Sequence, residues 1–288
     1  MRAFHLLVNP LSGGGAAPAC AVPVARALRE AGACVRLSYS PGPVGCRALV
    51  EESVSRDEVV VAVGGDGMVA SLAGAVVERG GVLGIIPAGR GNDFARQLGL
   101  PTEAAAVADR LLTGEVRSVD VIDAGGRVVV GSVYAGVDSR ASELVDRAHR
   151  LPRRLQYPYA AVRALASYQP TRFRIEVDGA THVQDAAAVI VANSGFYGSG
   201  MHIAPRADIT DGVLDVVVIG AASRLGLIRS MPRVYDGSHV DLPEVLTFKG
   251  REVTLRADRT QTAYADGERL AALPCIAVVR PGALRVLG

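Results

Sequence analysis

The chain has 288 residues, of which 49% are hydrophobic and 21% are charged, and its formal net charge at pH 7 is +2. This composition excludes a disordered chain, and the length allows a large core and two domains. The small net charge argues against nucleic-acid binding, and no apolar run reaches the ~20 residues that a membrane-spanning helix needs.

Residues 1–125 alternate between strand patterns and helix patterns. The strand patterns cover Phe4–Val8, Cys34–Tyr39, Glu58–Val63 and Val82–Pro87, and the helix patterns cover Ala16–Ala31, Arg47–Ser55, the stretch from the Gly64–Gly67 turn to Val77, and Ala104–Leu112. This alternation predicts an α/β domain, in which helices cover both faces of a parallel sheet.

After Val119 the pattern changes, because strands follow one another with turns between them. We predict strands at Val121–Ile122, Val128–Tyr134, Phe173–Val177, Ala187–Ala192, Leu214–Ile219, Glu252–Ala257, Thr262–Ala265 and Ile276–Arg280, and one helix at Tyr159–Tyr168. Such a run predicts an antiparallel β-sandwich or barrel. We place the domain boundary near Asp123–Gly126, so that residues 1–125 form one domain and residues 126–281 a second.

Three loops of the first domain follow predicted strands, at Asn9–Gly15, Gly64–Gly67 and Pro87–Asp93. Because ligands of an open parallel sheet bind beyond the carboxyl ends of its strands, we expect these loops to meet in one crevice. Glycines and a helix N-terminus suit a phosphate group. Asp66 would repel a bare phosphate, so its presence indicates a divalent cation between the two.

Seven motifs in order give the chain a resemblance to a known family. They are VNPLSGGG, VAVGGDG, PAGRGNDFAR, VDVIDAGG with YAGVDSRA, ANSGFYGSGMHIAP, ITDGVLDVVVI and YADGERL. In this order they resemble the diacylglycerol kinase family of lipid kinases, over nearly the whole chain. The resemblance implies an N-terminal α/β nucleotide domain, like that of NAD kinases and diacylglycerol kinases, and a C-terminal antiparallel β-sandwich that receives the lipid. It also implies that residues 282–288 return to the first domain.

The same resemblance implies ATP as phosphate donor and Mg²⁺ as cofactor, with Asp66 holding the metal. Residues expected near the nucleotide are Asn9, Ser40, Gly64, Gly65, Gly67, Met68, Ser71, Arg90, Asn92 and Asp93. A second, structural metal site is implied at Asp208, Asp211 and Val213.

Acidic residues are implied at the acceptor side as well. Asp266 and Glu268 match a pair near the acceptor hydroxyl, and Asp120 matches an acid at the domain junction. Either Glu268 or Asp266 is the general base, and we favour Glu268, with Asp120 or Asp266 orienting it or sharing the metal.

The chain departs from the family pattern near the expected nucleotide. Met68 stands where a hydroxyl is usual, Ala70 and Ser71 replace an Asn-Glu pair, and Arg90 replaces a threonine. The acids remain, so phosphate and metal handling is preserved while the donor contacts change. We hypothesise that the Arg90 guanidinium compensates by contacting a phosphate.

The leading prediction is an ATP-dependent kinase that converts diacylglycerol to phosphatidic acid. An NAD-kinase-like phosphotransferase and a non-catalytic lipid- or nucleotide-binding homologue are the alternatives. We expect a cytoplasmic location, because the four cysteines have neither zinc nor disulfide spacing. The cluster Arg147, Arg150, Arg153 and Arg154 is either a solvated helix end or a cationic lip for peripheral contact with anionic lipid. A homodimer is an open alternative, because many relatives pair.

Overall fold

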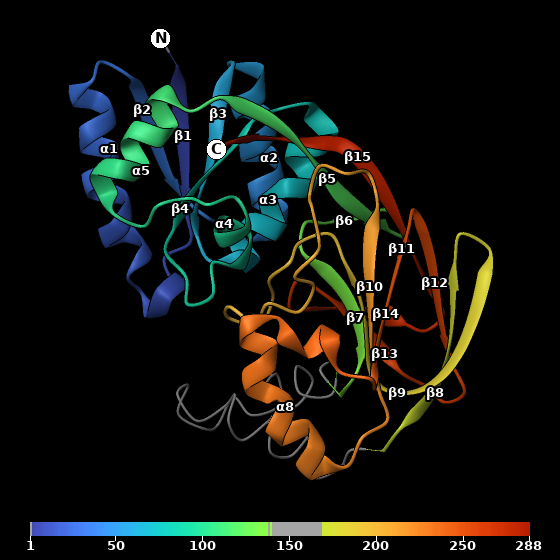
Figure 1. The fold of residues 1–288 in the computed structure, drawn as a ribbon. Coiled ribbons are helices and arrows are strands. Elements are labelled where there is room, and N and C mark those ends of the chain that lie inside the picture. Colours follow the sequence, from blue (N-terminus) through green and yellow to red (C-terminus); the bar gives the residue numbers. More distant parts are fainter. Residues whose placement is uncertain (1, 138, 140–168) are drawn as a thin grey trace.

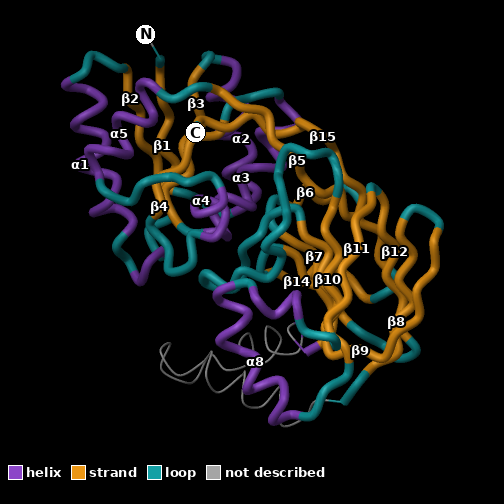
Figure 2. The backbone as a smooth tube through the Cα atoms, viewed as in Figure 1, coloured by secondary structure: helices purple, strands orange, loops and turns teal. Residues whose placement is uncertain are grey.

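The fold is that of a computed structural model, which describes residues 2–137, 139 and 169–288 (Figure 1). An α/β region contains the N-terminus, and a region of antiparallel strands follows it, as the distribution of helices and strands in Figure 2 shows. The fold class predicted from the sequence is therefore confirmed.

The α/β region contains a parallel sheet with the strand order β2-β1-β3-β4. Its strands are β1 (Ala3–Val8), β2 (Cys34–Tyr39), β3 (Glu58–Gly64) and β4 (Leu83–Pro87). Its helices are α1 (Ala17–Glu30), α2 (Pro43–Ser55), α3 (Asp66–Arg79), α4 (Asp93–Gln97) and α5 (Ala104–Thr113), with a short 3-10 turn, η1, at Ser12–Gly14.

Hydrophobic cores on both faces explain why the central strands are almost continuously apolar. On one face Phe4 and Leu6 of β1 pack with Leu28 of α1, in a core that α5 completes. On the other face Val60 of β3 packs with Leu72 of α3, together with residues of α2 and α4. The helices thus cover the sheet on both sides, as the alternating pattern predicts (Figure 1).

The second region is built from antiparallel pairs. Its strands are β5 (Val116–Ala124), β6 (Arg127–Val129), β7 (Ser132–Gly136), β8 (Thr171–Val177), β9 (Ala180–Ala192), β10 (Leu214–Gly220), β11 (Val245–Gly250), β12 (Glu252–Ala257), β13 (Thr262–Ala265), β14 (Glu268–Ala272) and β15 (Cys275–Leu287). Phe173, Ile175, Leu214 and Leu255 are fully buried in its core. Helix α8 (Arg224–Asp236) and the 3-10 turn η2 (Ser238–Asp241) connect β10 to β11.

Strand β15 joins the two regions. Its first part pairs with β12, its middle and end pair antiparallel with β5, and Val286 pairs in parallel with Leu83 of β4. The pairing register shifts between Arg280 and Leu284, so a bulge separates the two parts of the strand. The end of the chain therefore adds a strand to the N-terminal sheet.

Helix α8 is absent from the sequence prediction, which expected few helices in the second half. Gly226 and Pro232 lie within it and weaken the helix pattern. Its start is nevertheless capped, because the Ser223 hydroxyl accepts a hydrogen bond from the Gly226 N–H at 3.0 Å. Helix α4 and strands β11 and β14 were also missed.

The domain boundary stays a prediction. The predicted helix at Tyr159–Tyr168 and the arginine cluster at 147–154 lie outside the described residues. Among the described helices, none combines the length and apolarity needed to cross a membrane.

Candidate active site

The three loops predicted to form a crevice do meet in the structure. Gly65 and Gly89 lie so close that a Cβ atom on Gly89 would be 2.3 Å from the Cα of Gly65. A Cβ on Gly13 would be 2.5 Å from the carbonyl oxygen of Ala88, which brings the first loop against the third. Only glycine permits these approaches, so the paired glycines of the sequence serve to bring the loops together.

Asp66 is the first residue of α3 and lies at this meeting point. Its Oδ1 accepts a hydrogen bond from the Phe94 N–H at 3.2 Å, and its Oδ2 faces Gly91, where a Cβ would be 2.9 Å away. The Asp93 carboxylate lies near the same position, because the same Cβ would be 3.2 Å from the Asp93 Oδ2. Both carboxylates thus lie close to Gly91.

The environment of Asp93 disfavours its charged form. Burial raises the pKa of Asp93, the neighbouring Asp66 carboxylate raises it further, and N–H donors from Ser199 and Gly200 together with Arg96 act in the opposite direction. Adjacent carboxylates of this kind are relieved when a cation binds beside them. The pair Asp66 and Asp93 offers two carboxylates to a divalent metal, although no group of three or more possible side-chain ligands gathers among the described residues.

Asp93 also ties the α/β region to the β-rich region. Its carboxylate accepts hydrogen bonds from the Ser199 N–H at 2.9 Å and the Gly200 N–H at 2.7 Å. Gln97, at the end of α4, adds a third tie, because its Oε1 accepts from the Gly195 N–H at 2.9 Å. No local pattern in the sequence around Gln97 marks it as a contact between the two regions.

The other residues expected near the nucleotide have local partners. Asn92 braces its own loop, since its side chain both accepts from the Gly89 N–H at 2.8 Å and donates to the Gly89 carbonyl at 3.2 Å. Asn9 accepts from the Leu11 N–H at 3.0 Å. Ser40 follows β2, and its Oγ lies 3.0 Å from the Cys46 Sγ. Arg90 is exposed in the third loop.

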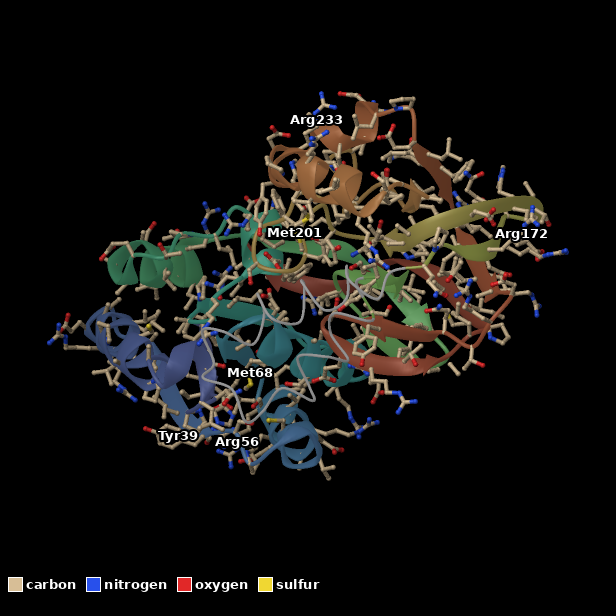
Figure 3. All side chains as sticks on the ribbon, turned by 90° about the horizontal axis from the view of Figure 1, so that it is seen from below. Tyr39, Arg56, Met68, Arg172, Met201 and Arg233 are labelled. Carbon is tan, nitrogen blue, oxygen red and sulfur yellow. The ribbon has the colours of Figure 1, made fainter. Side chains whose placement is uncertain are left out.

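Met68 and Ser71, which lie on α3 and were expected near the nucleotide, make contacts within the protein. Met68, labelled in Figure 3, has a side chain that is buried in the hydrophobic core, and it packs so close to Gly64 that a Cβ there would be 2.8 Å from the Met68 Cβ. The Ser71 hydroxyl donates to the Met68 carbonyl at 2.9 Å. Arg90 is therefore the polar replacement whose side chain is exposed.

Of the two acids expected near the acceptor, Asp266 is held by three backbone N–H groups, those of Val130, Gly131 and Ser132, at 2.9, 2.9 and 3.2 Å. Burial raises the pKa of Asp266 to about 6, against the effect of these donors and of Arg127. Glu268 is exposed two residues further on, and its Oε2 accepts a hydrogen bond from the Arg127 Nη2 at 2.6 Å. Asp266 anchors the turn, whereas Glu268 is presented to solvent.

Asp120 is buried at the junction of the two regions. Its Oδ1 accepts from the Gly282 N–H and its Oδ2 from the Gly212 N–H, both at 2.7 Å. Gly282 lies in the bulge of β15, so Asp120 fixes the point where that strand passes between the regions. Its carbonyl accepts from the Asn193 amide at 2.9 Å, and the same amide donates to the Val130 carbonyl. Asn193 was not predicted as a site residue.

The residues expected at a second metal have other partners. Asp208 Oδ1 accepts from the N–H and the hydroxyl of Thr210, at 2.9 and 2.7 Å, and Asp211 Oδ1 accepts from the Val213 N–H at 3.1 Å. The Lys249 ammonium lies 3.1 Å from Asp211 Oδ2 and 3.2 Å from Asp215 Oδ2. A protein cation already lies beside these acids, so this arrangement does not fit a second metal.

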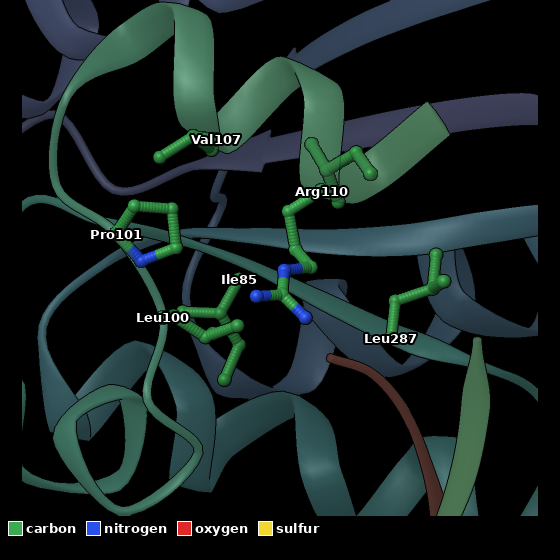
Figure 4. A pocket seen from close by; sticks show the side chains of 7 residues that line it. Ile85, Leu100, Pro101, Val107, Arg110 and Leu287 are labelled. Carbon is green, nitrogen blue, oxygen red and sulfur yellow. The ribbon is translucent and has the colours of Figure 1, made fainter. Parts of the chain in front are cut away.

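A shallow depression lies beneath α5 (Figure 4), and it has no enclosed space for a water molecule. It is lined by Ile85, Leu100, Pro101, Val107, Arg110, Leu111 and Leu287. None of these residues belongs to the three loops, and the depression is too shallow to enclose a ligand. It plays no part in the candidate site.

Comparison with protein families identifies the two regions. Residues 3–124 match the diacylglycerol kinase catalytic domain, and residues 131–288 match the YegS C-terminal NAD kinase beta sandwich-like domain. The fold is therefore that of a lipid kinase.

Individual relatives agree with this class. A diacylglycerol kinase of Mycobacterium tuberculosis (strain H37Rv) is 34% identical over 98% of this chain and 93% of its own length. The diacylglycerol kinase of Bacillus subtilis (strain 168) is 26% identical over 79% of this chain and 76% of its own length. A crystal structure of a diacylglycerol kinase from Bacillus anthracis has the same fold, with a TM-score of 0.74 at 19% identity over 99% of this chain and 96% of that one. The chain belongs to the diacylglycerol kinase family, as its sequence motifs predict, and is a lipid kinase for which the family implies ATP as phosphate donor.

Proposed function

We propose that this lipid kinase transfers the γ-phosphate of ATP to the free hydroxyl of diacylglycerol and so forms phosphatidic acid. The observation that carries the proposal is the convergence of three strand-end loops on Asp66 and Asp93. The names of the relatives support diacylglycerol as the acceptor.

Donor binding uses the loops around α3. The first turn of α3 presents backbone N–H groups to the phosphates, and glycines allow close approach of the chain. Mg²⁺ held by Asp66, with Asp93 beside it, would supply neutralising charge for the phosphate oxygens. One Asp66 oxygen is fixed by the Phe94 N–H, so the side chain is oriented before any cation arrives. Arg90, exposed in the third loop, adds a contact to the donor phosphates.

Acceptor activation uses the turn between β13 and β14. Glu268 takes the proton of the attacking hydroxyl, while Asp266 acts as a positioning residue that fixes the turn through its three N–H bonds. The Arg127 guanidinium pairs with Glu268 and orients its carboxylate. Losing a positioned base costs about 10²–10⁴ in rate.

The proposal is tested by incubating the protein with ATP labelled at the γ-phosphate, Mg²⁺, and either diacylglycerol in detergent micelles or NAD. Label in the extracted lipid, identified as phosphatidic acid, is the expected result. Label on NAD would support the NAD-kinase-like alternative, and nucleotide binding without transfer would support the non-catalytic one. Either of these results would overturn the proposal.

A further inference from the structure

Helix α8 carries an apolar face that no described part of the protein covers. Leu225, Ile228, Met231 and Tyr235 recur at spacings of three or four residues, which places them on one side of the helix. Between 41% and 66% of the surface of each of these residues is exposed. Large apolar residues exposed together in this way indicate an interaction surface.

This face is distinct from the one that anchors the helix. Leu227 and Val234 are buried, and they lie on another side of the helix from the exposed residues. Other exposed apolar side chains, such as Val22 on α1 and Val44 on α2, stand on separate elements of the α/β region. Helix α8 therefore has enough apolar side chains to pack on the protein and to present a second apolar face outward.

The charges on α8 have one predominant sign. Arg224, Arg229 and Arg233 are exposed along it, and Arg233 lies at the edge of the molecule in Figure 3. The single acid of the helix is its last residue, Asp236, whose carboxylate accepts from the Ser238 N–H at 2.8 Å. An apolar face bordered by arginines is the pattern of a helix that lies in the headgroup region of an anionic bilayer.

The helix is connected to the loops of the candidate site. The Val234 carbonyl of α8 accepts from the His202 N–H at 2.8 Å. His202 follows Met201, which Figure 3 shows close to α8, and the preceding Ser199 and Gly200 donate to Asp93. A surface bound by α8 would therefore lie near the loop that contains Ser199 and Gly200 and contacts Asp93.

We propose that α8 docks this lipid kinase onto anionic membrane, with its apolar face among the headgroups and its arginines paired with lipid phosphates. The proposal rests on the proposed function, because diacylglycerol resides in a bilayer and must be reached there. A second copy of the chain is the less favoured occupant. In a two-fold symmetric contact between α8 helices, the arginines of one copy would face those of the other.

The test is co-sedimentation with vesicles of phosphatidylcholine containing phosphatidylglycerol, without ATP. The double variant Ile228→Ser/Tyr235→Ser should lose about tenfold or more in partition coefficient, because two apolar side chains no longer enter the headgroup region. Arg229→Glu/Arg233→Glu should also weaken binding, by about fivefold for each arginine removed, and 0.5 M salt should reproduce much of that loss. The matched control Val22→Ser, an exposed apolar change on α1, should bind as the unchanged protein does.

The outcomes separate this inference from the proposed function. If the unchanged protein labels micellar diacylglycerol but the α8 variants bind vesicles as well as it does, the docking surface is wrong. If Ile228→Ser/Tyr235→Ser instead converts a dimer to a monomer, the face belongs to a second copy. If binding depends on α8 while no lipid is labelled, the docking surface stands and the proposed reaction fails. Thermal unfolding of each variant shows whether the fold is retained.

Discussion

The acids of the two regions look alike in sequence and are used differently in the structure. Asp66 accepts one backbone hydrogen bond and lies beside a second carboxylate, that of Asp93. Asp120 accepts two N–H bonds and Asp266 accepts three. The backbone donors of Asp120 and Asp266 fix parts of the chain, whereas Asp66 has one backbone donor and an adjacent carboxylate, a setting that suits a bound cation.

The largest expected effect is that of Asp66→Asn. Loss of the carboxylate should lower kcat for lipid phosphorylation by about 10²–10³ or more, because charge stabilisation of the transferring phosphate is lost. Stability should change little, since the Asn oxygen can still accept from the Phe94 N–H. Steady-state kinetics at saturating Mg²⁺ measures the effect, with Asp57→Asn as an exposed control. Undiminished turnover would remove Asp66 from the metal site.

Glu268→Gln comes next. If Glu268 accepts the proton, kcat should fall by about 10²-fold while the KM for ATP is retained. The control is Glu252→Gln, which changes an exposed acid at the start of β12. A fall in kcat of less than about threefold for Glu268→Gln would assign the role of base to Asp266. It would contradict the view that Asp266 only fixes the turn.

Asp120→Asn should act on stability. An amide can accept from only one of the two N–H groups and directs its own NH₂ at the other, so a buried donor loses its partner. We expect the free energy of unfolding to fall by about 2–4 kcal/mol. Urea denaturation followed by circular dichroism measures it, with the exposed Asp109→Asn as control. An unchanged midpoint would show that the bulge of β15 does not depend on this carboxylate.

Asp266 should give stability a dependence on pH. Its pKa is raised to about 6 in the folded protein, so the folded state binds this proton more tightly than the unfolded state does. The contribution of Asp266 to stability is therefore present below about pH 4 and is lost as the pH rises through about 6. Unfolding curves measure this effect. The free energy of unfolding of the unchanged protein should fall between about pH 5 and about pH 7, and the fall should be smaller for Asp266→Asn. Equal falls would mean that Asp266 is ionised throughout.

The smallest effect is expected from Arg90→Ala. An exposed guanidinium that contacts a donor phosphate should contribute uniform binding, so the KM for ATP should rise about three- to tenfold at unchanged kcat. Isothermal titration with a non-hydrolysable ATP analogue gives the same comparison without turnover. An unchanged KM would mean that Arg90 makes no contact with the donor phosphates.

Local sequence patterns predicted the strands and helices that short-range apolar periodicity and turns define. Apolar runs followed by glycine-containing loops located β3 and β4, and the order of strands and helices gave the fold class. The convergence of three loops followed from the rule for parallel sheets. Helix α8 was missed because Gly226 and Pro232 interrupt its pattern, while the burial of Leu227 and Val234 stabilises it in the folded chain.

The site could be predicted only as a set of residue types. Gln97 and Arg127 act on residues 98 and 141 positions away, and nothing in their neighbourhood in the sequence announces those partners. In the same way, the sequence could not show that the Asp266 carboxylate is filled by backbone donors or that Lys249 lies beside Asp211. These are properties of tertiary packing, which a motif does not contain.

Strand β15 has a consequence for how the protein is made. One edge of β4 in the N-terminal sheet is completed by the last residues of the chain, so that edge has no strand partner while the ribosome is still adding the β-rich region. Open strand edges are templates for pairing with other chains. Pairing of β15 with β4 and β5 therefore closes this edge only after the β-rich region has been made.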